Sequence, residues 1–338
     1  MGALRVLVVD DSVFMRKVIS EIISSDPQLN VVGTAADGID ALEKIATLKP
    51  DVVTLDVNMP RMDGLTTLKH IMEQNPIPVV MLSSATQEGA AITFKALELG
   101  AVDYIPKPSG ELSLDIGKIR DEIITKIKTA AQAKIASRIK GTRHLIQFRE
   151  KPREKIITIG ASTGGPPAIE EILEQLPKDV PPILIVQHMP VGFTKPFANR
   201  LDSLTQFSVK EAEEGDKIIP GQALVAPAGF HMIVTKDKRI HLDLRPPIHG
   251  VRPAVDPMME TTAQVYKSQA IGVLLTGMGR DGALGMKAIK NYGGVTIAQN
   301  EESCTVFGMP KAAIEEGCVD KVLHISQIAE EIIRQCQQ

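Results

Sequence analysis

Short apolar runs that alternate with amphipathic segments limit most strongly how this chain can fold. In the first third of the sequence these runs lie at 6–10, 31–35, 51–56, 78–83 and 102–107. A strand that is apolar along most of its length is typically buried on both faces, as in a parallel sheet covered by helices. The segments between the runs carry helical spacing, for example at Val18, Ile22 and Ile23. Five strand–helix units therefore predict a doubly wound five-stranded parallel sheet.

A second alternation of the same kind occupies the C-terminal half. Its strand-like runs lie at 155–162, 182–188, 223–229, 270–277, 294–299 and 321–325. Two further runs, 231–235 and 239–244, flank a polar Lys-Asp-Lys turn and predict a β-hairpin. We therefore expect a second α/β domain that has a parallel, Rossmann-like sheet and a small antiparallel hairpin.

The length of 338 residues exceeds what one ordinary hydrophobic core accommodates, so two domains are expected. Apolar residues with helical spacing between Asp115 and Ile135 indicate a long helix that closes the first domain. The basic stretch from Lys134 to Lys155 is typical of a solvated linker. The predicted organisation is a first domain at 1–130, a linker at 131–154 and a second domain at 155–338.

Charge and cysteine usage exclude several classes of protein. The net charge of −3 gives no reason to expect nucleic acid as a partner. Cys304, Cys318 and Cys336 form no CxxC pair and leave one cysteine over, so neither a zinc site nor a disulfide framework is expected. The sequence lacks the long apolar region of a signal peptide and any apolar run long enough to span a bilayer. We expect a cytoplasmic protein that does not insert into membranes.

Polar residues end four of the five predicted strands of the first domain. Asp10 and Asp11 end the first strand, Asp56 the third, Ser83 the fourth and Lys107 the fifth. The carboxyl ends of parallel strands meet at one edge of a sheet, so these side chains are expected to gather there. Clustered carboxylates repel one another, and a hard cation such as Mg²⁺ offsets that repulsion through oxygen ligands. With Mg²⁺ and Lys107 absorbing charge, Asp56 is predicted to attack a phosphoryl group whose oxygen Ser83 can hydrogen-bond.

The segments VVDDS, LDVNMPRMDG, MLSS and YIPKPS resemble the receiver domain of bacterial two-component response regulators, which has a flavodoxin-like fold. The resemblance covers about residues 4–129. It implies that Asp56 takes phosphate from a histidine kinase, and that Ser83 and Tyr104 change orientation when this happens. It also implies a Mg²⁺ site with four ligands: Asp10, Asp11, Asp56 and the backbone carbonyl of Asn58. The first domain is thus expected to be a switch whose output lies in the second.

The glycine-rich segment 160–165, GASTGG, follows an apolar run in the second domain and precedes a predicted helix. A dinucleotide or phosphate loop is weakly supported because the GxGxxG spacing and a Walker lysine are absent. A purely structural turn is the second interpretation. The third is the G-x-S-x-G elbow, in which Gly160 and Gly164 allow a tight turn that raises the hydroxyl of Ser162 above the sheet.

Two other strand ends favour the elbow, because a serine becomes a strong nucleophile only when a base takes its proton. His188 ends one apolar run, and Asp281 lies in the glycine-rich loop after another. Alone, each has a plain structural explanation, as a strand-end histidine or an Asx turn. Together, the three strand ends supply a nucleophile, a base and an orienting carboxylate. Their order Ser, His, Asp differs from the order of α/β-hydrolases, but such triads are defined by roles.

Six segments resemble the catalytic domain of the chemotaxis protein-glutamate methylesterase family, in which a receiver domain also comes first: IGASTGGPPAI, VQHMP, APAGFHM, VRPAVDPMM, TGMGRDGALG and VFGMPKAA. The resemblance implies Ser162 as nucleophile, His188 as general base and Asp281 as the residue that orients His188. It places Thr163 and the backbone N–H of Met278 near the oxyanion.

The resemblance also implies a reaction and partners. The expected reaction is hydrolysis of glutamate γ-methyl esters on methyl-accepting chemoreceptors, with deamidation of receptor glutamines as a second activity. A chemotaxis histidine kinase is the expected phosphodonor, and the esterase reaction needs no cofactor. Because the first domain has no output of its own, we expect it to inhibit the second until Asp56 is phosphorylated.

Two other functions are possible for a receiver domain joined to a second domain or for a serine triad. A transcriptional response regulator would carry a DNA-binding helix-turn-helix in its C-terminal half, whereas that half reads as strand-rich α/β. A stand-alone deamidase of another target would share the triad but would not act on methylated receptors.

Overall fold

The computed structural model describes residues 2–84, 86–107, 116–134 and 154–338. The chain forms two compact units, Met1–Arg138 and Ile139–Gln338, and each is described by itself. Most of the predicted linker 131–154 lies outside the described residues, so its bounds and those of the flanking domains stay predictions.

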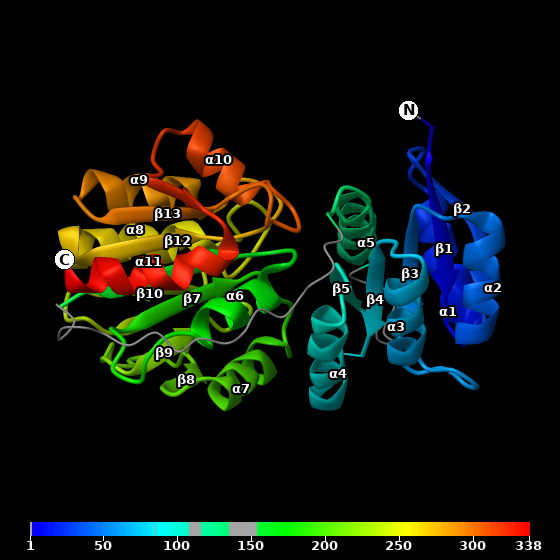
Figure 1. Cartoon of the computed structure of the whole chain (residues 1–338), viewed down its shortest axis with the longest axis horizontal. Coiled ribbons are helices and arrows are strands. Elements are labelled where there is room, and N and C mark those ends of the chain that lie inside the picture. The colour runs from blue at the N-terminus through cyan, green and yellow to red at the C-terminus, as the bar shows by residue number, and fades with distance from the viewer. Residues whose placement is uncertain (1, 85, 108–115, 135–153) are drawn as a thin grey trace. The chain divides into compact units, whose positions relative to one another are not determined.

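The first unit is the predicted five-stranded sheet, whose strands are all parallel and lie in the order β2-β1-β3-β4-β5 (Figure 1). This is the flavodoxin-like order. The strands are β1 Leu4–Val9, β2 Leu29–Ala35, β3 Val52–Asp56, β4 Val79–Ser83 and β5 Asp103–Pro106. The helices are α1 Val13–Ser24, α2 Gly38–Leu48, α3 Gly64–Gln74, α4 Gln87–Glu98 and α5 Ile116–Ala131.

Local sequence explains where the helices of this unit begin. Ser12, Asp37, Asp63 and Thr86 stand immediately before α1 to α4, and each side chain accepts a hydrogen bond from a backbone N–H of the first turn. Such caps satisfy donors that a helix leaves free at its N-terminus. The caps before α1 and α4 therefore fix where the chain turns into a helix soon after two strand ends with predicted functional residues, Asp10 and Asp11 after β1 and Ser83 at the end of β4.

The second unit is a seven-stranded parallel sheet in the order β14-β13-β12-β6-β7-β9-β8, beside a separate antiparallel pair, β10-β11. The sheet strands are β6 Ile156–Ala161, β7 Ile183–Gln187, β8 Ser208–Glu211, β9 Gln222–Val225, β12 Ala270–Leu274, β13 Val295–Gln299 and β14 Lys321–Leu323. The pair is β10 His231–Val234 and β11 Ile240–Asp243, which confirms the predicted hairpin.

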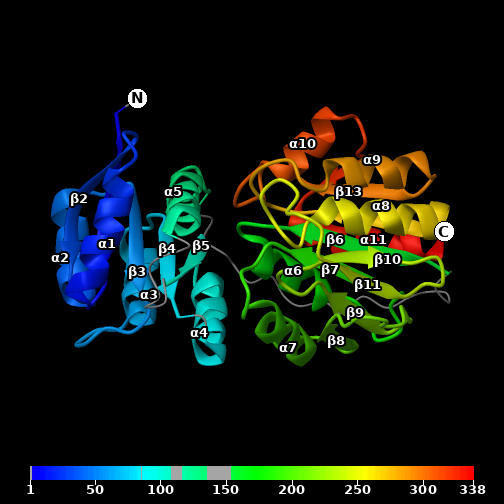
Figure 2. The same ribbon diagram turned by 180° about the vertical axis from the view of Figure 1, so that it is seen from behind.

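Helices cover both faces of this sheet (Figures 1 and 2). They are α6 Gly165–Leu173, α7 Thr194–Leu204, α8 Val255–Tyr266, α9 Ala283–Asn291, α10 Met309–Glu315 and α11 Ile325–Gln337, with a 3-10 turn at Lys267–Gln269. α6 packs against α7 and α11, whereas α9 packs against α8 and α10. In this unit the first strand, β6, lies in the middle of the sheet. The strands β7, β9 and β8 are on one side of it, and the later strands β12, β13 and β14 are on the other. The sheet's switch point is therefore the β6–β12 pair, where open α/β sheets place their functional sites.

Candidate active site

The turn that carries Ser162 joins β6 to α6 and is tied to the end of β12. The backbone N–H of Ser162 donates to the carbonyl of Thr276 at 3.0 Å, and its own carbonyl accepts from the N–H of Gly165 at 2.7 Å. Gly164 has a φ of +75°, and a Cβ there would lie 2.4 Å from Oγ1 of Thr305. A side chain at this position would thus be strained and would clash. Ser162 is half-buried on this turn.

His188 and Asp281 meet beside this turn. Ala161 and Gln187 are paired in the register of β6 and β7, so Ser162 and His188 directly follow neighbouring strand ends. The backbone N–H of His188 donates to the carbonyl of Ala161 at 3.1 Å. Nε2 of the imidazole lies 2.7 Å from Oδ2 of Asp281, in the loop after β12. The structure therefore brings the three predicted residues to one edge of the sheet at its switch point.

The ring nitrogen that contacts Asp281 decides which nitrogen is left for the serine. In the common triad the carboxylate holds Nδ1, and Nε2 accepts the serine proton. Here the carboxylate holds Nε2. Nδ1 of His188 is then the ring nitrogen left for the predicted proton transfer from Ser162.

Asp281 also holds the start of α8. Oδ2 accepts from the N–H of Val255 at 2.7 Å, and Oδ1 accepts from the N–H of Asp256 at 3.0 Å. Burial disfavours the ionised carboxylate, but the hydrogen bond and charge of His188 and the two backbone N–H groups outweigh burial and lower the pKa of Asp281. The residue predicted to orient His188 is therefore held ionised by a helix N-terminus as well as by the imidazole.

Asp256 completes a reciprocal arrangement that the sequence did not reveal. It lies in the first turn of α8, and its Oδ1 accepts from the N–H of Gly285 in α9 at 2.8 Å. Its Oδ2 lies 3.3 Å from Nε2 of His249. Asp281, which precedes α9, thus accepts hydrogen bonds from the start of α8. Asp256, in the first turn of α8, accepts one from the start of α9. Burial and the nearby charge of Asp281 raise the pKa of Asp256 to about 6.

We expect Asp256→Asn to change how the stability of the second unit depends on pH. The raised pKa means that folded Asp256 holds its proton more tightly than unfolded Asp256 does. The contribution of this proton to the free energy of unfolding is complete below the pKa of unfolded Asp256, about 4. It is lost as the pH rises through the folded pKa of about 6. A shift of this size corresponds to roughly 3 kcal/mol. Asparagine stays uncharged, so the variant should gain stability relative to the wild type between pH 4 and 7.

Calorimetry of the wild type and the variant across this pH range measures that difference. Asp179→Asn, at an exposed turn residue of the same unit, is the matched control. A difference between Asp256→Asn and wild type that stays constant from pH 4 to 7 would contradict the assignment.

The remaining predicted residues of the second unit flank Ser162. Thr163 is buried, and its carbonyl accepts from Oγ1 of Thr276 at 3.0 Å. A Cβ at Gly277 would lie 2.8 Å from Cβ of Ser162, so the loop after β12 passes directly beside the predicted nucleophile. Met278, next in that loop, is 50% exposed.

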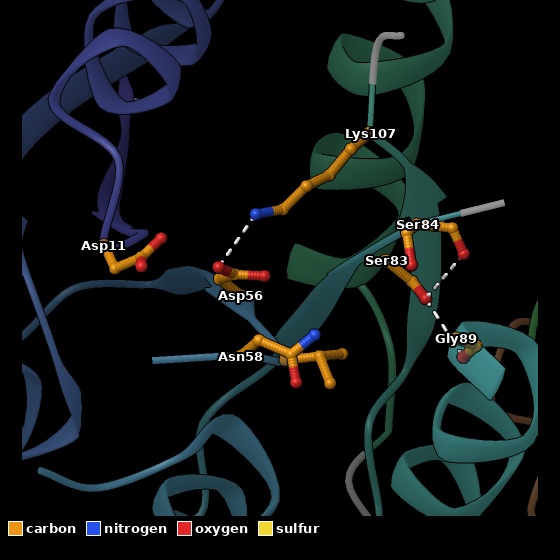
Figure 3. A pocket seen from close by; sticks show the side chains of 8 residues that line it. Asp11, Asp56, Asn58, Ser83, Ser84, Gly89 and Lys107 are labelled. Atoms are coloured by element: carbon orange, nitrogen blue, oxygen red, sulfur yellow. Dashed lines mark hydrogen bonds and ion pairs between the residues drawn. The ribbon is translucent and has the colours of Figure 1, made fainter. Parts of the chain in front are cut away.

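The predicted acidic site of the first unit forms a pocket (Figure 3). It is lined by Asp11, Asp56, Val57, Asn58, Ser83, Ser84, Gly89 and Lys107. Nζ of Lys107 lies 2.9 Å from Oδ2 of Asp10 and 2.8 Å from Oδ2 of Asp56. Burial raises the pKa of Asp56, with Lys107 opposing and the charge of Asp10 adding to the rise. Burial would lower the pKa of Lys107, but the two carboxylates raise it.

The carboxylates of this pocket fit a divalent cation. Oxygens of Asp10, Asp11 and Asp56 lie within 4.8 Å of one another. Oδ2 of Asp10 and of Asp56 are buried and, among the described residues, have no hydrogen bond apart from the ion pairs to Lys107. Buried carboxylate oxygens beside an open pocket are the donor set that Mg²⁺ takes.

Of the two predicted switch residues, Ser83 lines the pocket and Tyr104 does not. Oγ of Ser83 donates to the carbonyl of Gly89 at 3.1 Å and accepts from Oγ1 of Thr93 at 2.7 Å, so it is bonded to α4. Tyr104 is buried away from the pocket lining, with Nζ of Lys126 4.9 Å from its ring centre. Burial, with the charges of Asp103 and Glu122, raises the pKa of the Tyr104 hydroxyl.

Comparison with known proteins gives two family matches. Residues 6–115 match the response regulator receiver domain, and residues 157–332 match the CheB methylesterase domain. A curated relative from Pyrococcus horikoshii, named protein-glutamate methylesterase/protein-glutamine glutaminase, is 52% identical over 98% of this chain and 93% of its own. A relative of the same name from Halalkalibacterium halodurans is 49% identical over 99% of both chains.

A solved structure supports the same comparison. The crystal structure of the CheB methylesterase catalytic domain of Thermotoga maritima is 48% identical, covers 54% of this chain and 98% of its own, and gives a TM-score of 0.52. The second unit is thus a methylesterase-type sheet, not the DNA-binding output domain considered from the sequence. In the described part of the chain no helix has the length and apolar character needed to cross a membrane.

Proposed function

Because the chain belongs to the CheB methylesterase family, whose curated relatives span it almost completely, we propose that Ser162, His188 and Asp281 hydrolyse glutamate γ-methyl esters on chemotaxis receptors. The 2.7 Å contact between His188 and Asp281, beside the Ser162 turn at the sheet's switch point, is the observation that carries the proposal. It supplies an oriented base where the elbow presents a serine.

The reaction proceeds in two halves. Oγ of Ser162 attacks the ester carbonyl, and its proton passes to Nδ1 of His188 while Asp281 stabilises the resulting imidazolium. Thr163 and the backbone N–H of Met278 stabilise the tetrahedral oxyanion; one such donor typically contributes about 2.7–4 kcal/mol. His188 then gives the proton to the departing methoxide, which leaves as methanol. Water repeats the sequence on the acyl-enzyme and releases glutamate and free Ser162.

The same acyl-enzyme forms from a glutamine side chain when ammonia leaves in place of methanol. Two assays distinguish the receptor enzyme from a deamidase of another target. Receptor membranes that carry labelled methyl groups report methanol release, and mass spectrometry of the same receptors reports conversion of glutamine to glutamate. Methanol release together with conversion of receptor glutamines supports the proposal, whereas receptors that show neither change would overturn it.

The first unit controls this activity through Asp56. Oδ of Asp56 takes the phosphoryl group of a phosphohistidine on the chemotaxis kinase, and Lys107 is placed to balance the added charge. Asp10, Asp11 and Asp56, with the backbone carbonyl of Asn58, would hold a Mg²⁺ ion, which neutralises charge on the phosphoryl oxygens when bound. Ser83 must leave the carbonyl of Gly89 to reach the phosphoryl group. Tyr104 is the second residue proposed to change orientation.

We expect Asp56→Asn to hold methanol release at its basal level whatever phosphodonor is supplied. An amide cannot form the acyl phosphate, and the rest of the pocket stays in place. The measurement is methanol release from methylated receptors with and without acetyl phosphate and Mg²⁺. Asp121→Asn, at an exposed position of the same unit, is the control and should respond as the wild type does.

A second chain, beginning at about Arg153, separates inhibition from direct activation. If the first unit inhibits, this chain should exceed the basal rate without phosphodonor. A phosphodonor response that survives in Asp56→Asn would show that Asp56 is not the acceptor.

A further inference from the structure

Gln187, the last residue of β7, links the backbones on either side of the candidate triad. The residue is only 3% exposed. Nε2 donates to the carbonyl of Ser162 at 2.9 Å and to the carbonyl of His188 at 3.1 Å. The two amide hydrogens thus bind the carbonyl of the nucleophile's residue and that of the base's residue.

The opposite end of the same amide is unusual. Oε1 of Gln187 is buried and, within the described part of the chain, has no hydrogen-bond partner. A buried acceptor without a partner costs stability. A Cβ at Gly165 would lie 2.0 Å from this oxygen, although Gly165 is not among the glycines with positive φ. Gly165 therefore makes room for Gln187, whereas its neighbour Gly164 permits the turn.

The orientation of the amide follows from its neighbours. If the amide were reversed, Oε1 would face two carbonyl oxygens that also lack a hydrogen to share, and both contacts would be repulsive. The carbonyls of Ser162 and His188 therefore need two N–H donors that lie in one rigid plane. Among uncharged side chains, asparagine and glutamine supply such a pair, and asparagine is one methylene shorter.

We propose that Gln187 is a positioning residue for ester hydrolysis, which fixes the backbone of Ser162 relative to that of His188. This inference rests on the proposed function. Asp281 holds the imidazole of His188 at its far nitrogen, and Gln187 holds the backbone from which that imidazole extends. The nucleophile is held by the same amide. Without Gln187, the distance between Oγ of Ser162 and Nδ1 of His188 is no longer held fixed. A displacement of about 1 Å at a reacting group lowers the rate on the order of 100-fold.

The test uses Gln187→Met in the full chain, because methionine has a similar length and removes the two donors together with the unpartnered oxygen. We expect kcat for methanol release to fall about 100-fold, with KM for receptor membranes unchanged. The rate at which a fluorophosphonate modifies Ser162 should fall by a similar factor, since that reaction needs the serine and its base but no receptor. Gln175→Met is the matched control: Nε2 of Gln175 donates to the carbonyl of Glu171 on the surface of the same unit, and both rates should stay at wild-type values.

Circular dichroism and the thermal midpoint report whether the variant is folded, and rates are expressed per folded molecule. If Gln187→Met does not fold, Gln187→Asn takes its place, because the shorter amide cannot reach both carbonyls and should show the same loss of kcat. Wild-type kcat and labelling rate in the folded variant would overturn the inference. That result is distinct from failure of the proposed function, which would appear as methanol release that survives the loss of the Ser162 hydroxyl.

Discussion

Ser162→Ala is expected to lower methanol release from methylated receptors by at least about 10⁴-fold, as removal of a triad nucleophile does in other serine hydrolases. The fold should be unaffected, because the hydrogen bonds that shape the turn use only the backbone of Ser162. Its N–H donates to Thr276, and its carbonyl accepts from Gly165 and Gln187. Alanine keeps all three.

The measurement is initial-rate methanol release at saturating receptor, with the thermal midpoint recorded for the same preparation. Ser203→Ala is the control, because Ser203 is exposed on the same unit and its hydroxyl donates to a local carbonyl, that of Arg200. The control should keep the wild-type rate. A Ser162→Ala protein that releases methanol within about tenfold of the wild type would remove the serine from the mechanism.

His188→Gln is expected to reduce the rate by a similar factor. Glutamine can still donate a hydrogen bond to Asp281, but an amide cannot take the proton of Ser162. Because the residues of a triad act as a unit, adding His188→Gln to Ser162→Ala should cause no further loss. Rates of the two single variants and the double variant, measured together, test this non-additivity.

His241→Gln provides the matched control, since His241 is exposed on β11 and pairs with Glu214. Multiplication of the two single losses in the double variant would indicate that Ser162 and His188 act independently.

The sequence predicted most of the fold because the strands of both sheets are apolar along their length. The strand missed was β8 at Ser208–Glu211, which lies at the edge of the sheet and has an exposed first residue. An edge strand has one neighbour and needs less apolar surface, so it leaves a weak signal. The hairpin of β10 and β11 was predicted because a polar turn separates two apolar runs.

The candidate triad stays a prediction; the sequence suggested it because Ser162 and His188 directly follow two apolar strands and Asp281 lies in the loop after a third. The sequence did not suggest the residues that support it. Asp256 bonds to α9 and Gln187 to two backbone carbonyls, and both roles exist only after distant segments meet. Each has an ordinary explanation in the sequence, as an acidic residue in a first helical turn or the polar end of a strand. The choice of Nε2 for Asp281 likewise depends on tertiary geometry.

Fold topology explains why a triad in the order Ser, His, Asp can form here. Ser162 follows β6 and His188 follows β7, while Asp281 follows β12, the other neighbour of β6. The central strand thus leads to the candidate nucleophile, and the two strands beside it lead to the candidate base and carboxylate. Because β12 comes late in the chain, the carboxylate comes last.

Every methanol-releasing turnover is proposed to pass through Ser162. Graded modification of the wild-type protein with a fluorophosphonate tests it most directly, with modified Ser162 quantified by mass spectrometry and methanol release measured on the same samples. We expect release to fall in proportion to the modified fraction and to reach zero when all Ser162 is modified. Methanol release that persists after complete modification of Ser162 would contradict the proposal.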